Sequence, residues 1–332
     1  MPGTDECFAR EVEEGVLKKA RGARTKGARK ISSVPRSWIL DPACMHTVLR
    51  KPAWLKKPIR ESDGRRSVEH ILQRQGLHTV CREACCPNLS ECFARGTATF
   101  LLMGARCTRA CRFCAVDHGV PSPLDSGEPV RIAAAARDMG LRHAVLTSVT
   151  RDDLQDGGAA HFCAAISALR RTSPGIVVEA LTPDFQGSEA ALAALAEHAP
   201  DIFNHNVETV PRLYHIRPGA LFERSLSVLA CARALMPGAR IKSGLMVGLG
   251  ETRDEVFETI ARLRQSGCDM LCVGQYLAPS RAHEPVVEYV TPGQFDEYRD
   301  HALSLGFSGA LCGPFVRSSY MADTVTVETE TV

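Results

Sequence analysis

Two cysteine triplets constrain this 332-residue chain more than any other feature of its sequence. Their members are Cys81, Cys86 and Cys92, followed by Cys107, Cys111 and Cys114. The second triplet has the spacing C-x3-C-x2-C, so one tight loop can direct three thiolates onto three irons of a cubane cluster. The fourth iron then has no protein ligand and can chelate a small molecule. This loop therefore predicts a catalytic cluster, because a fully ligated cluster more often only carries electrons.

Closely spaced cysteines also bind zinc, which is the alternative interpretation of both triplets. Structural zinc prefers four protein ligands, whereas each triplet supplies three cysteines and no histidine at a matching offset. His118 lies nearby in the sequence, but its position fits no zinc spacing. The residues favour iron-sulfur clusters and leave a zinc-stabilised, nucleic acid-binding protein as the more distant alternative.

The composition is that of an intracellular enzyme. With 45% hydrophobic residues the chain can bury a core large enough for one barrel-sized domain. Its 14 cysteines suit a secreted disulfide framework only in a much shorter chain, and we expect no secretion signal and reduced thiols. The apolar stretch at 176–181 is far shorter than the roughly 20 residues that span a bilayer, so we expect no membrane role.

Positive charge is concentrated near the N-terminus although the net charge is only +2. Residues 18–60 are rich in lysine and arginine and hold one acidic residue, Asp41. No regular interleaving of aromatic residues accompanies this charge, so we interpret residues 1–50 as a solvated, poorly ordered arm rather than a nucleic acid-binding segment. The five acidic residues between positions 5 and 14 argue against a mitochondrial transit peptide and favour a cytoplasmic protein.

Beyond the cysteines, apolar runs alternate with helical stretches about every thirty residues, which is typical of successive β-α units. The predicted strands are short, apolar and in part β-branched: 98–104, 143–149, 176–182, 202–207, 241–247 and 270–276. The predicted helices have apolar residues three or four positions apart: 159–171, 189–198, 222–235, 253–266 and 292–305. Six such units predict an α/β fold, a partial (β/α)6 TIM-type barrel.

Parallel barrels place their chemistry on the loops that follow the strands, and polar residues occupy those positions here. The loop after the second predicted strand carries Gly157 and Gly158, which would let backbone groups approach a ligand. A plain helix-start loop explains the two glycines equally well. The segment after the fourth strand carries Asn206, Glu208 and Arg217, whose side chains could contact a ligand or lie on the surface.

The motif C-R-F-C that ends at Cys114 resembles the cluster loop of radical S-adenosylmethionine (SAM) enzymes. Three further motifs resemble the lipoyl synthase family: T-V-C-R-E-A-C-C-P-N-L-S-E-C around the first triplet, G-T-A-T-F-L-L-M-G before Cys107, and R-S-S-Y from Arg317. They occur in the family's order, and the resemblance extends over about residues 51–323. It implies a radical SAM barrel with extensions, divided into an arm (1–50), a segment with auxiliary cluster ligands (51–97), the barrel (98–305) and a C-terminal segment (306–332).

The resemblance also implies a set of ligands. The second triplet would hold the catalytic [4Fe-4S] cluster, with SAM on its open iron. The first triplet would hold an auxiliary [4Fe-4S] cluster whose remaining ligand is Ser318, with Ser319 as the nearby alternative. Gly157, Gly158, Asn206, Glu208 and Arg217 match family positions that hold SAM, although the usual acidic residue after the two glycines is Ala159 here. Cys85 also departs from the pattern and adds a competing thiol beside Cys86.

The implied activity is sulfur insertion at C6 and C8 of a protein-bound octanoyl-lysine chain, which makes the lipoyl cofactor. The implied partners are octanoylated lipoyl domains of 2-oxoacid dehydrogenase E2 subunits and the glycine cleavage H protein, a flavodoxin or ferredoxin reductant, and an iron-sulfur carrier. The nearer alternative is another radical SAM sulfur-inserting enzyme, similar to biotin synthase or a methylthiotransferase. Those families lack the first triplet combined with the terminal R-S-S-Y.

Overall fold

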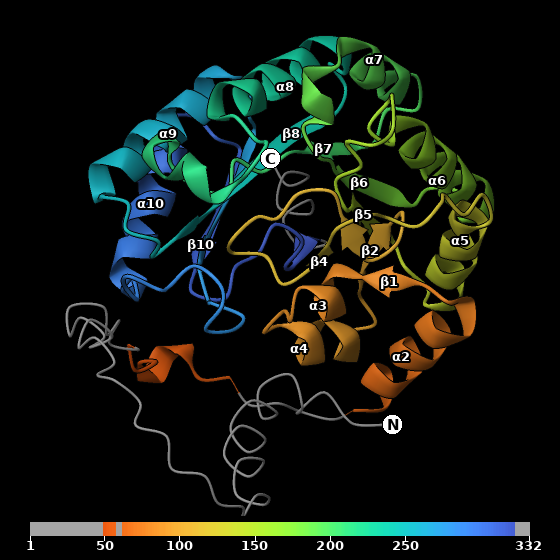
Figure 1. Cartoon of the computed structure of the whole chain (residues 1–332), viewed down its shortest axis with the longest axis horizontal. Helices are drawn as coiled ribbons and strands as arrows, with labels where there is room; N and C mark the ends of the chain where they lie inside the picture. Colours follow the sequence, from red (N-terminus) through yellow and green to blue (C-terminus); the bar gives the residue numbers. More distant parts are fainter. Residues whose placement is uncertain (1–48, 58–61, 323–332) are drawn as a thin grey trace, which may run out of the picture. The chain divides into compact units, whose positions relative to one another are not determined.

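The computed structural model describes residues 49–57 and 62–322, and the sheet at its centre has eight strands (Figure 1). Along the sheet the order is β1-β2-β5-β6-β7-β8-β9-β10. β1 is antiparallel to β2, and every other neighbouring pair is parallel. The strands are β1 (His78–Thr79), β2 (Thr99–Leu102), β5 (His143–Ser148), β6 (Val177–Leu181), β7 (Ile202–Asn204), β8 (Arg240–Val247), β9 (Met270–Gln275) and β10 (Gly309–Gly313).

All six strands predicted from the sequence are present as β2 and β5 to β9, and the fold class is confirmed. One further parallel strand, β10, extends the sheet beyond the prediction by pairing with β9, with Gly309 opposite Met270. Two of its five residues are glycine, which has a low strand propensity, so its pairing with β9 and not its own sequence fixes it as a strand. After β10 the chain turns back over β9, where a side chain at Gly274 would lie 2.1 Å from Val316 O.

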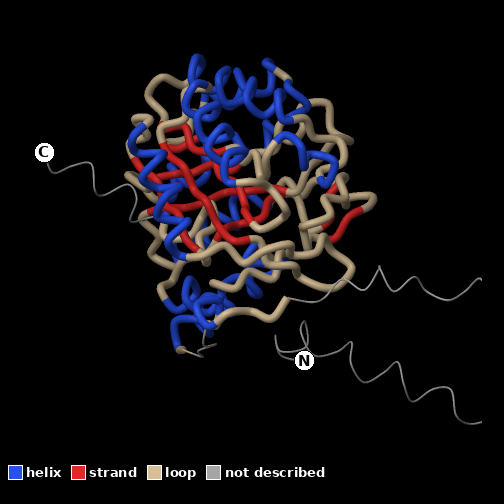
Figure 2. Tube along the Cα trace, turned by 90° about the vertical axis from the view of Figure 1, so that its left-hand side faces the viewer, coloured by secondary structure: helices blue, strands red, loops and turns tan. Residues whose placement is uncertain are grey.

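Helices form a layer outside the sheet (Figures 1 and 2). They are α5 (Glu128–Asp138), α6 (Ala159–Thr172), α7 (Glu189–Glu197), α8 (Phe222–Leu235), α9 (Arg253–Gln265) and α10 (Pro292–Ser304). The five predicted helices are confirmed, whereas α5 was not predicted. It has Pro129 in its first turn, and its buried face consists of Ile132 and several alanines, so it has fewer large apolar residues than a typical amphipathic helix.

The helices before the barrel are η2 (Ala53–Leu55), α2 (Asp63–Gln75), α3 (Val80–Glu83) and α4 (Leu89–Ala94). A second, two-stranded sheet of β3 (Arg106–Cys107) and β4 (Asp117–His118) frames the second cysteine triplet. Two 3-10 helices, η3 (Phe185–Gly187) and η4 (Pro211–Ile216), follow β6 and β7. The arm predicted for 1–50 lies outside the described residues except for its last two positions. Within the described part of the chain no helix is both long and apolar enough to cross a membrane.

Large apolar side chains fill the space between the layers, and one ion pair is buried with them. Phe100, Phe162 and Phe203 are fully buried. Lys242 Nζ of β8 lies 3.0 and 3.2 Å from the carboxylate oxygens of Glu179 on β6, and Asn204 Nδ2 of the intervening strand donates to Glu179 Oε1 at 2.7 Å. Burial alone would raise the pKa of Glu179, but Lys242, His143 and Asn204 together outweigh it and the pKa falls to about 2.

Candidate active site

The second cysteine triplet lies at the edge of the sheet where the parallel strands end. Cys107 follows β2 on the chain, Thr150 follows β5, and Asp184 follows β6. The carboxyl ends of parallel strands meet at one edge of a sheet, so these loops come together there. We call residues 107–114 the cluster loop.

Backbone hydrogen bonds join the cluster loop to the loop after β5. Thr150 N and Arg109 N donate to Cys107 Sγ at 3.2 and 3.4 Å. Thr108 N and its hydroxyl donate to Thr150 O, and the hydroxyl accepts from Asp152 N. Two N–H groups therefore face the Cys107 sulfur, where they would stabilise a thiolate.

The opposite side of the cluster loop is held by the loops after β7 and β9. Arg112 N donates to Ile216 O at 2.9 Å, and Arg112 O accepts from Glu284 N at 2.8 Å. The guanidinium of Arg112 pairs with the Glu284 carboxylate at 2.8 Å. His283 Nε2 lies 3.2 Å from Cys114 O and donates to it. The cluster loop is thus fixed from both sides by chain segments distant in sequence.

Two thiols of this triplet, Cys111 and Cys114, favour the protonated form in the protein without iron. Burial, together with the nearby Cys111 and Cys107, raises the pKa of Cys114 to about 12. Burial also raises the pKa of Cys111, which Arg217 partly offsets. Binding of iron must therefore displace protons, so cluster assembly is coupled to proton release.

The first triplet is brought together by two short helices. Cys81 lies in α3, Cys92 lies in α4, and Cys86 lies in the turn between them. Cys85 adopts a left-handed conformation (φ 48°), and Cys86 N donates to Cys81 O at 3.1 Å. Cys85, which departs from the family motif, therefore lies just after the end of α3, where the chain reverses direction.

The three thiols of the first triplet lie close enough to influence one another electrostatically. Burial raises the pKa of Cys81 to about 12, with Cys86 and Cys92 adding to the effect, and burial and Cys86 raise that of Cys92 to about 11. Among the described residues, no three His, Cys, Asp or Glu side chains are arranged to hold a single metal ion. A cubane takes each thiolate on a separate iron, so its ligands need not converge on one point.

The segment after β10 joins the first triplet to the barrel. Asn88, which is 1% exposed, donates from Nδ2 to Phe315 O at 2.7 Å. The Tyr320 hydroxyl donates to Glu91 Oε1 at 2.9 Å. Lys57 pairs with Glu91 and lies 5.0 Å from the centroid of the Phe315 ring. Residues on both sides of Ser318 are therefore fixed to the helices that carry the first triplet.

Ser318 contacts a residue of the barrel. Its hydroxyl donates to Asn206 Oδ1 at 2.8 Å, and Asn206 Nδ2 donates to Glu208 Oε1 at 3.1 Å. A side chain at Gly244 would lie 3.0 Å from both Asn206 Oδ1 and Ser318 Oγ, so glycine there leaves room for this contact. The neighbouring Arg317 interacts electrostatically with Glu208 on one side and Cys86 on the other. The structure thus brings Ser318 to Asn206 of the barrel.

Arg217 has an unused donor that fits a carboxylate ligand. Its Nη1 donates to Val207 O at 2.9 Å and to the Tyr214 hydroxyl at 2.7 Å. Its Nε is buried and has no hydrogen-bond partner in the part of the chain that the structure describes. Burial raises the pKa of the nearby Glu208, and Arg217 counteracts that rise. A buried donor beside a carboxylate fits the charges of an amino acid group and the hydroxyls of a ribose.

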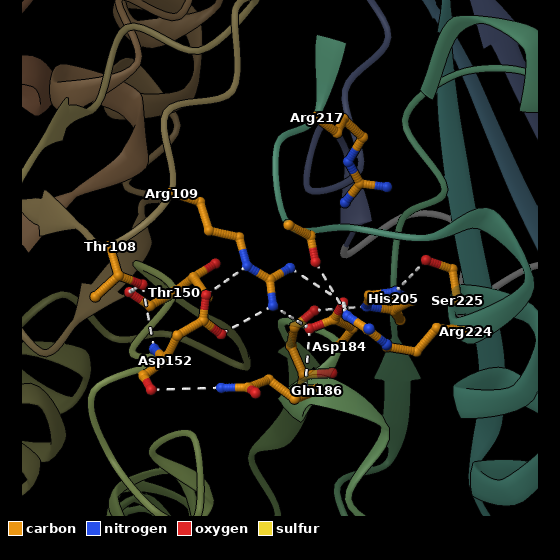
Figure 3. A network of polar contacts seen from close by, with 12 residues as sticks. Thr108, Arg109, Thr150, Asp152, Asp184, Gln186, His205, Arg217, Arg224 and Ser225 are labelled. Carbon is orange, nitrogen blue, oxygen red and sulfur yellow. Dashed lines mark hydrogen bonds and ion pairs between the residues drawn. The ribbon is translucent and has the colours of Figure 1, made fainter. Parts of the chain in front are cut away.

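A directed chain of hydrogen bonds supports Arg217 from behind. The Tyr214 hydroxyl accepts from Arg217 and lies 3.1 Å from Ser225 Oγ, which in turn lies 3.0 Å from His205 Nε2. His205 Nδ1 donates to Thr182 O at 2.9 Å. Burial lowers the pKa of His205 to about 4, so its ring is neutral and Nε2 accepts from Ser225. Figure 3 shows His205 and Ser225 beside each other.

This buried histidine predicts a pH-dependent stability. The pKa of His205 is about 4 in the folded protein and near 6.5 when unfolded, so the unfolded chain binds more protons between these values. We expect the contribution of neutral His205 to the free energy of unfolding to be complete above pH 6.5. This contribution should fall by up to about 3 kcal/mol as the pH approaches 4. Urea unfolding of the wild type and His205→Gln from pH 4 to 7 measures it. Equal slopes of the two unfolding free energies against pH would contradict the assignment.

Gly157 and Gly158 are required by the local structure. Both have positive φ angles, 60° and 93°, and Gly158 begins α6. A side chain at Gly158 would lie 2.4 Å from Met103 Sδ, and one at Gly157 would lie 3.0 Å from the Phe185 ring. Packing and turn geometry therefore account for both glycines, and contact with SAM remains a prediction.

The charged residues that contact one another at the cluster loop were not predicted from the sequence. Arg109 lies inside the C-x3-C motif, and its side chain is 7% exposed between Asp152 and Asp184 (Figure 3). A signal was available, because both acids directly follow neighbouring strands of the predicted barrel, at the edge where ligands bind.

The chain is similar to known proteins over most of its length. The Radical SAM superfamily matches residues 101–263. Lipoyl synthase from Methylococcus capsulatus is 54% identical over 300 residues, covering 90% of this chain and 92% of that protein. Lipoyl synthase from Photorhabdus laumondii is 48% identical over 310 residues, covering 92% and 96%. The crystal structure of Streptococcus suis SuiB bound to precursor peptide SuiA aligns with a TM-score of 0.50 at 12% identity, covering 64% of this chain and 48% of that one, and supports the fold alone.

Proposed function

This chain belongs to the lipoyl synthase family of radical SAM enzymes. From that premise we propose which of its residues bind the two clusters and SAM. The enzyme uses SAM and [4Fe-4S] chemistry to insert sulfur and form the lipoyl cofactor. Cys107, Cys111 and Cys114 hold the catalytic cluster. The observation that carries this assignment is their position at the carboxyl edge of the sheet, with two N–H groups donating to Cys107 Sγ.

Cys107, Cys111 and Cys114 would hold a [4Fe-4S] cluster that, when reduced, would supply the electron for reductive cleavage of SAM. Arg217 offers its buried Nε to the SAM carboxylate, and Glu208 accepts from the ribose hydroxyls. Asn206 orients Glu208 through their hydrogen bond. Gly157 and Gly158 allow the backbone of the loop after β5 to approach SAM. The loops that surround the cluster loop exclude water from the reacting groups.

The auxiliary cluster is a substrate that supplies both sulfurs. Cys81, Cys86, Cys92 and Ser318 hold it, so residues 51–97 and 306–332 form the sulfur-donor part and residues 98–305 form the radical-generating part. Support comes from the contacts that fix residues 315–320 to α4 and the turn before it. A serine oxygen is a weaker ligand to iron than a thiolate, which suits a cluster that is dismantled.

The substrate protein carries a lipoyl domain. We infer that its lysine is octanoylated, that sulfur enters at C6 and C8, and that E2 subunits and the glycine cleavage H protein are both accepted. A flavodoxin or ferredoxin would donate electrons, and an iron-sulfur carrier would rebuild the auxiliary cluster after turnover. Thiolate ligands require reduced cysteines, so we infer a cytoplasmic location.

The test is turnover of an octanoyl-lysyl peptide by the anaerobically reconstituted protein with SAM and a reductant. We expect 5′-deoxyadenosine together with a lipoyl peptide of the mass that two added sulfurs give. Cleavage of SAM without a sulfur-containing peptide would contradict the sulfur-insertion function.

The Arg217→Lys variant tests the SAM site. Lysine keeps the charge but cannot reproduce the donor geometry of Nε, so we expect SAM to bind about 10- to 100-fold more weakly. Equilibrium binding of SAM to the reconstituted variant measures this, and Arg253→Lys on the outside of α9 is the control. Unchanged SAM affinity in Arg217→Lys would remove Arg217 from the site.

A further inference from the structure

A buried guanidinium lies inside the cluster loop. Arg109 makes four hydrogen bonds to two carboxylates: Nε and Nη2 donate to Asp152 at 2.7 and 2.9 Å, and Nη1 and Nη2 donate to Asp184 at 3.0 and 2.8 Å. The side chain of Asp184 is only 2% exposed. Figure 3 shows the guanidinium between the two acids. Such forked pairs fix orientation as well as charge.

These contacts tie the cluster loop to two neighbouring strands and to the SAM side of the site. Asp152 follows β5 and Asp184 follows β6. Arg224 of α8 donates to Asp184 at 3.2 Å and to Gly219 O at 3.0 Å. A side chain at Gly219 would lie 3.4 Å from Arg109 Nε, so the turn after Arg217 packs over the guanidinium. We call Arg109, Asp152, Asp184 and Arg224 the clamp.

The charges of the clamp balance, and its two carboxylates accept several hydrogen bonds each. It contains two guanidinium groups and two carboxylates, and Asp184 also accepts from Gln186 N at 3.1 Å. Burial would raise the pKa of Asp184, but the bonds from Arg109 outweigh it and lower the pKa to about 2. Asp184 therefore binds Arg109 as a carboxylate at neutral pH.

The contacts of the Arg109 side chain also fix the orientation of the Arg109 backbone N–H group. The Arg109 N–H donates to Cys107 Sγ, as does Thr150 N–H, and Asp152 lies two residues after Thr150. The clamp therefore holds both donors against the sulfur. Hydrogen bonds to cluster sulfurs raise the reduction potential, because they stabilise the extra negative charge of the reduced state.

We propose that Arg109 is a positioning residue that holds the two N–H donors on the Cys107 sulfur and thereby sets the reduction potential and retention of the catalytic cluster. This inference rests on the proposed assignment of Cys107, Cys111 and Cys114 as ligands of that cluster. Arg109 belongs to the cluster loop, is not itself a ligand of the cluster, and acts through Cys107.

Arg109→Lys and Asp152→Asn test the proposal in the full-length reconstituted enzyme. Lysine keeps the charge of Arg109 but cannot bridge two carboxylates. Asp152 is 31% exposed, so its replacement by the near-isosteric asparagine perturbs the core least. Arg253→Lys, which weakens the exposed pair with Glu297, is the matched control. Potentiometric titration followed by electron paramagnetic resonance reports the cluster whose spectrum responds to SAM.

Both clamp variants should shift the potential of the SAM-responsive cluster to more negative values and speed loss of its iron to a chelator about 10- to 100-fold. The control should match the wild type. The proposal is overturned if the variants keep the wild-type potential and SAM response, even if their melting temperature falls. A wild type without any SAM-responsive cluster would instead refute the proposed function.

Discussion

Replacing Cys107, Cys111 and Cys114 together by alanine should abolish SAM cleavage and halve the iron content of the anaerobically reconstituted protein. Two cubanes correspond to about eight irons per chain, and either alanine triple should leave about four. The Cys81→Ala/Cys86→Ala/Cys92→Ala protein should still cleave SAM, because its catalytic cluster is intact, but it should form no lipoyl product. Iron, sulfide and 5′-deoxyadenosine assays distinguish the two variants.

A matched control is Cys163→Ala, which alters a buried cysteine on α6 that lies outside both triplets. This variant should keep about eight irons and wild-type turnover. If each triple variant lost all its iron, the two triplets would form one site. Bound zinc without sulfide would contradict both clusters.

The second large effect concerns stability and the buried pair of Glu179 and Lys242. Lys242→Met should lower the free energy of unfolding by about 3–5 kcal/mol, because it leaves a buried carboxylate without its cation. The contribution of Glu179 should be present above about pH 4.5, its ordinary pKa, and fall as the pH approaches its folded pKa of about 2. Chemical denaturation of the reduced protein measures the loss.

The double variant Glu179→Gln/Lys242→Met separates charge from packing. Glutamine is neutral and still accepts from Asn204 Nδ2, so most of the lost unfolding free energy should return. If the double variant is as unstable as Lys242→Met alone, the loss comes from packing of the lysine chain and not from the unpaired carboxylate.

Sequence reasoning predicted the elements that carry strong local signals. Six strands and five helices have clear apolar periods, whereas β10 depends on pairing with β9, and the buried face of α5 consists mostly of alanines, which give a weak apolar signal. The cysteines were predictable because their ligand spacing is local. The partners of Arg109 lie 43 and 75 residues away, so its role depends on which strands are neighbours.

The contact of Ser318 with Asn206 also escaped the sequence analysis. The motif R-S-S-Y placed Ser318 with the auxiliary cluster through the family resemblance alone, with nothing to indicate a neighbour in the barrel. That neighbour depends on the turn after β10, which returns the chain over β9 at Gly274. A single sequence reveals such a crossing only after the register of the last two strands is known.

The hydrogen bonds of Asn88 and Glu91 with Phe315 and Tyr320 join residues 227 and 229 positions apart. During synthesis the first triplet leaves the ribosome long before the segment that binds α4 and the turn before it. At about 5–20 residues per second the delay is roughly 11–45 seconds. The nascent chain lacks these contacts for that interval, so the site proposed for the sulfur-donating cluster is complete only after the last segment has been synthesised.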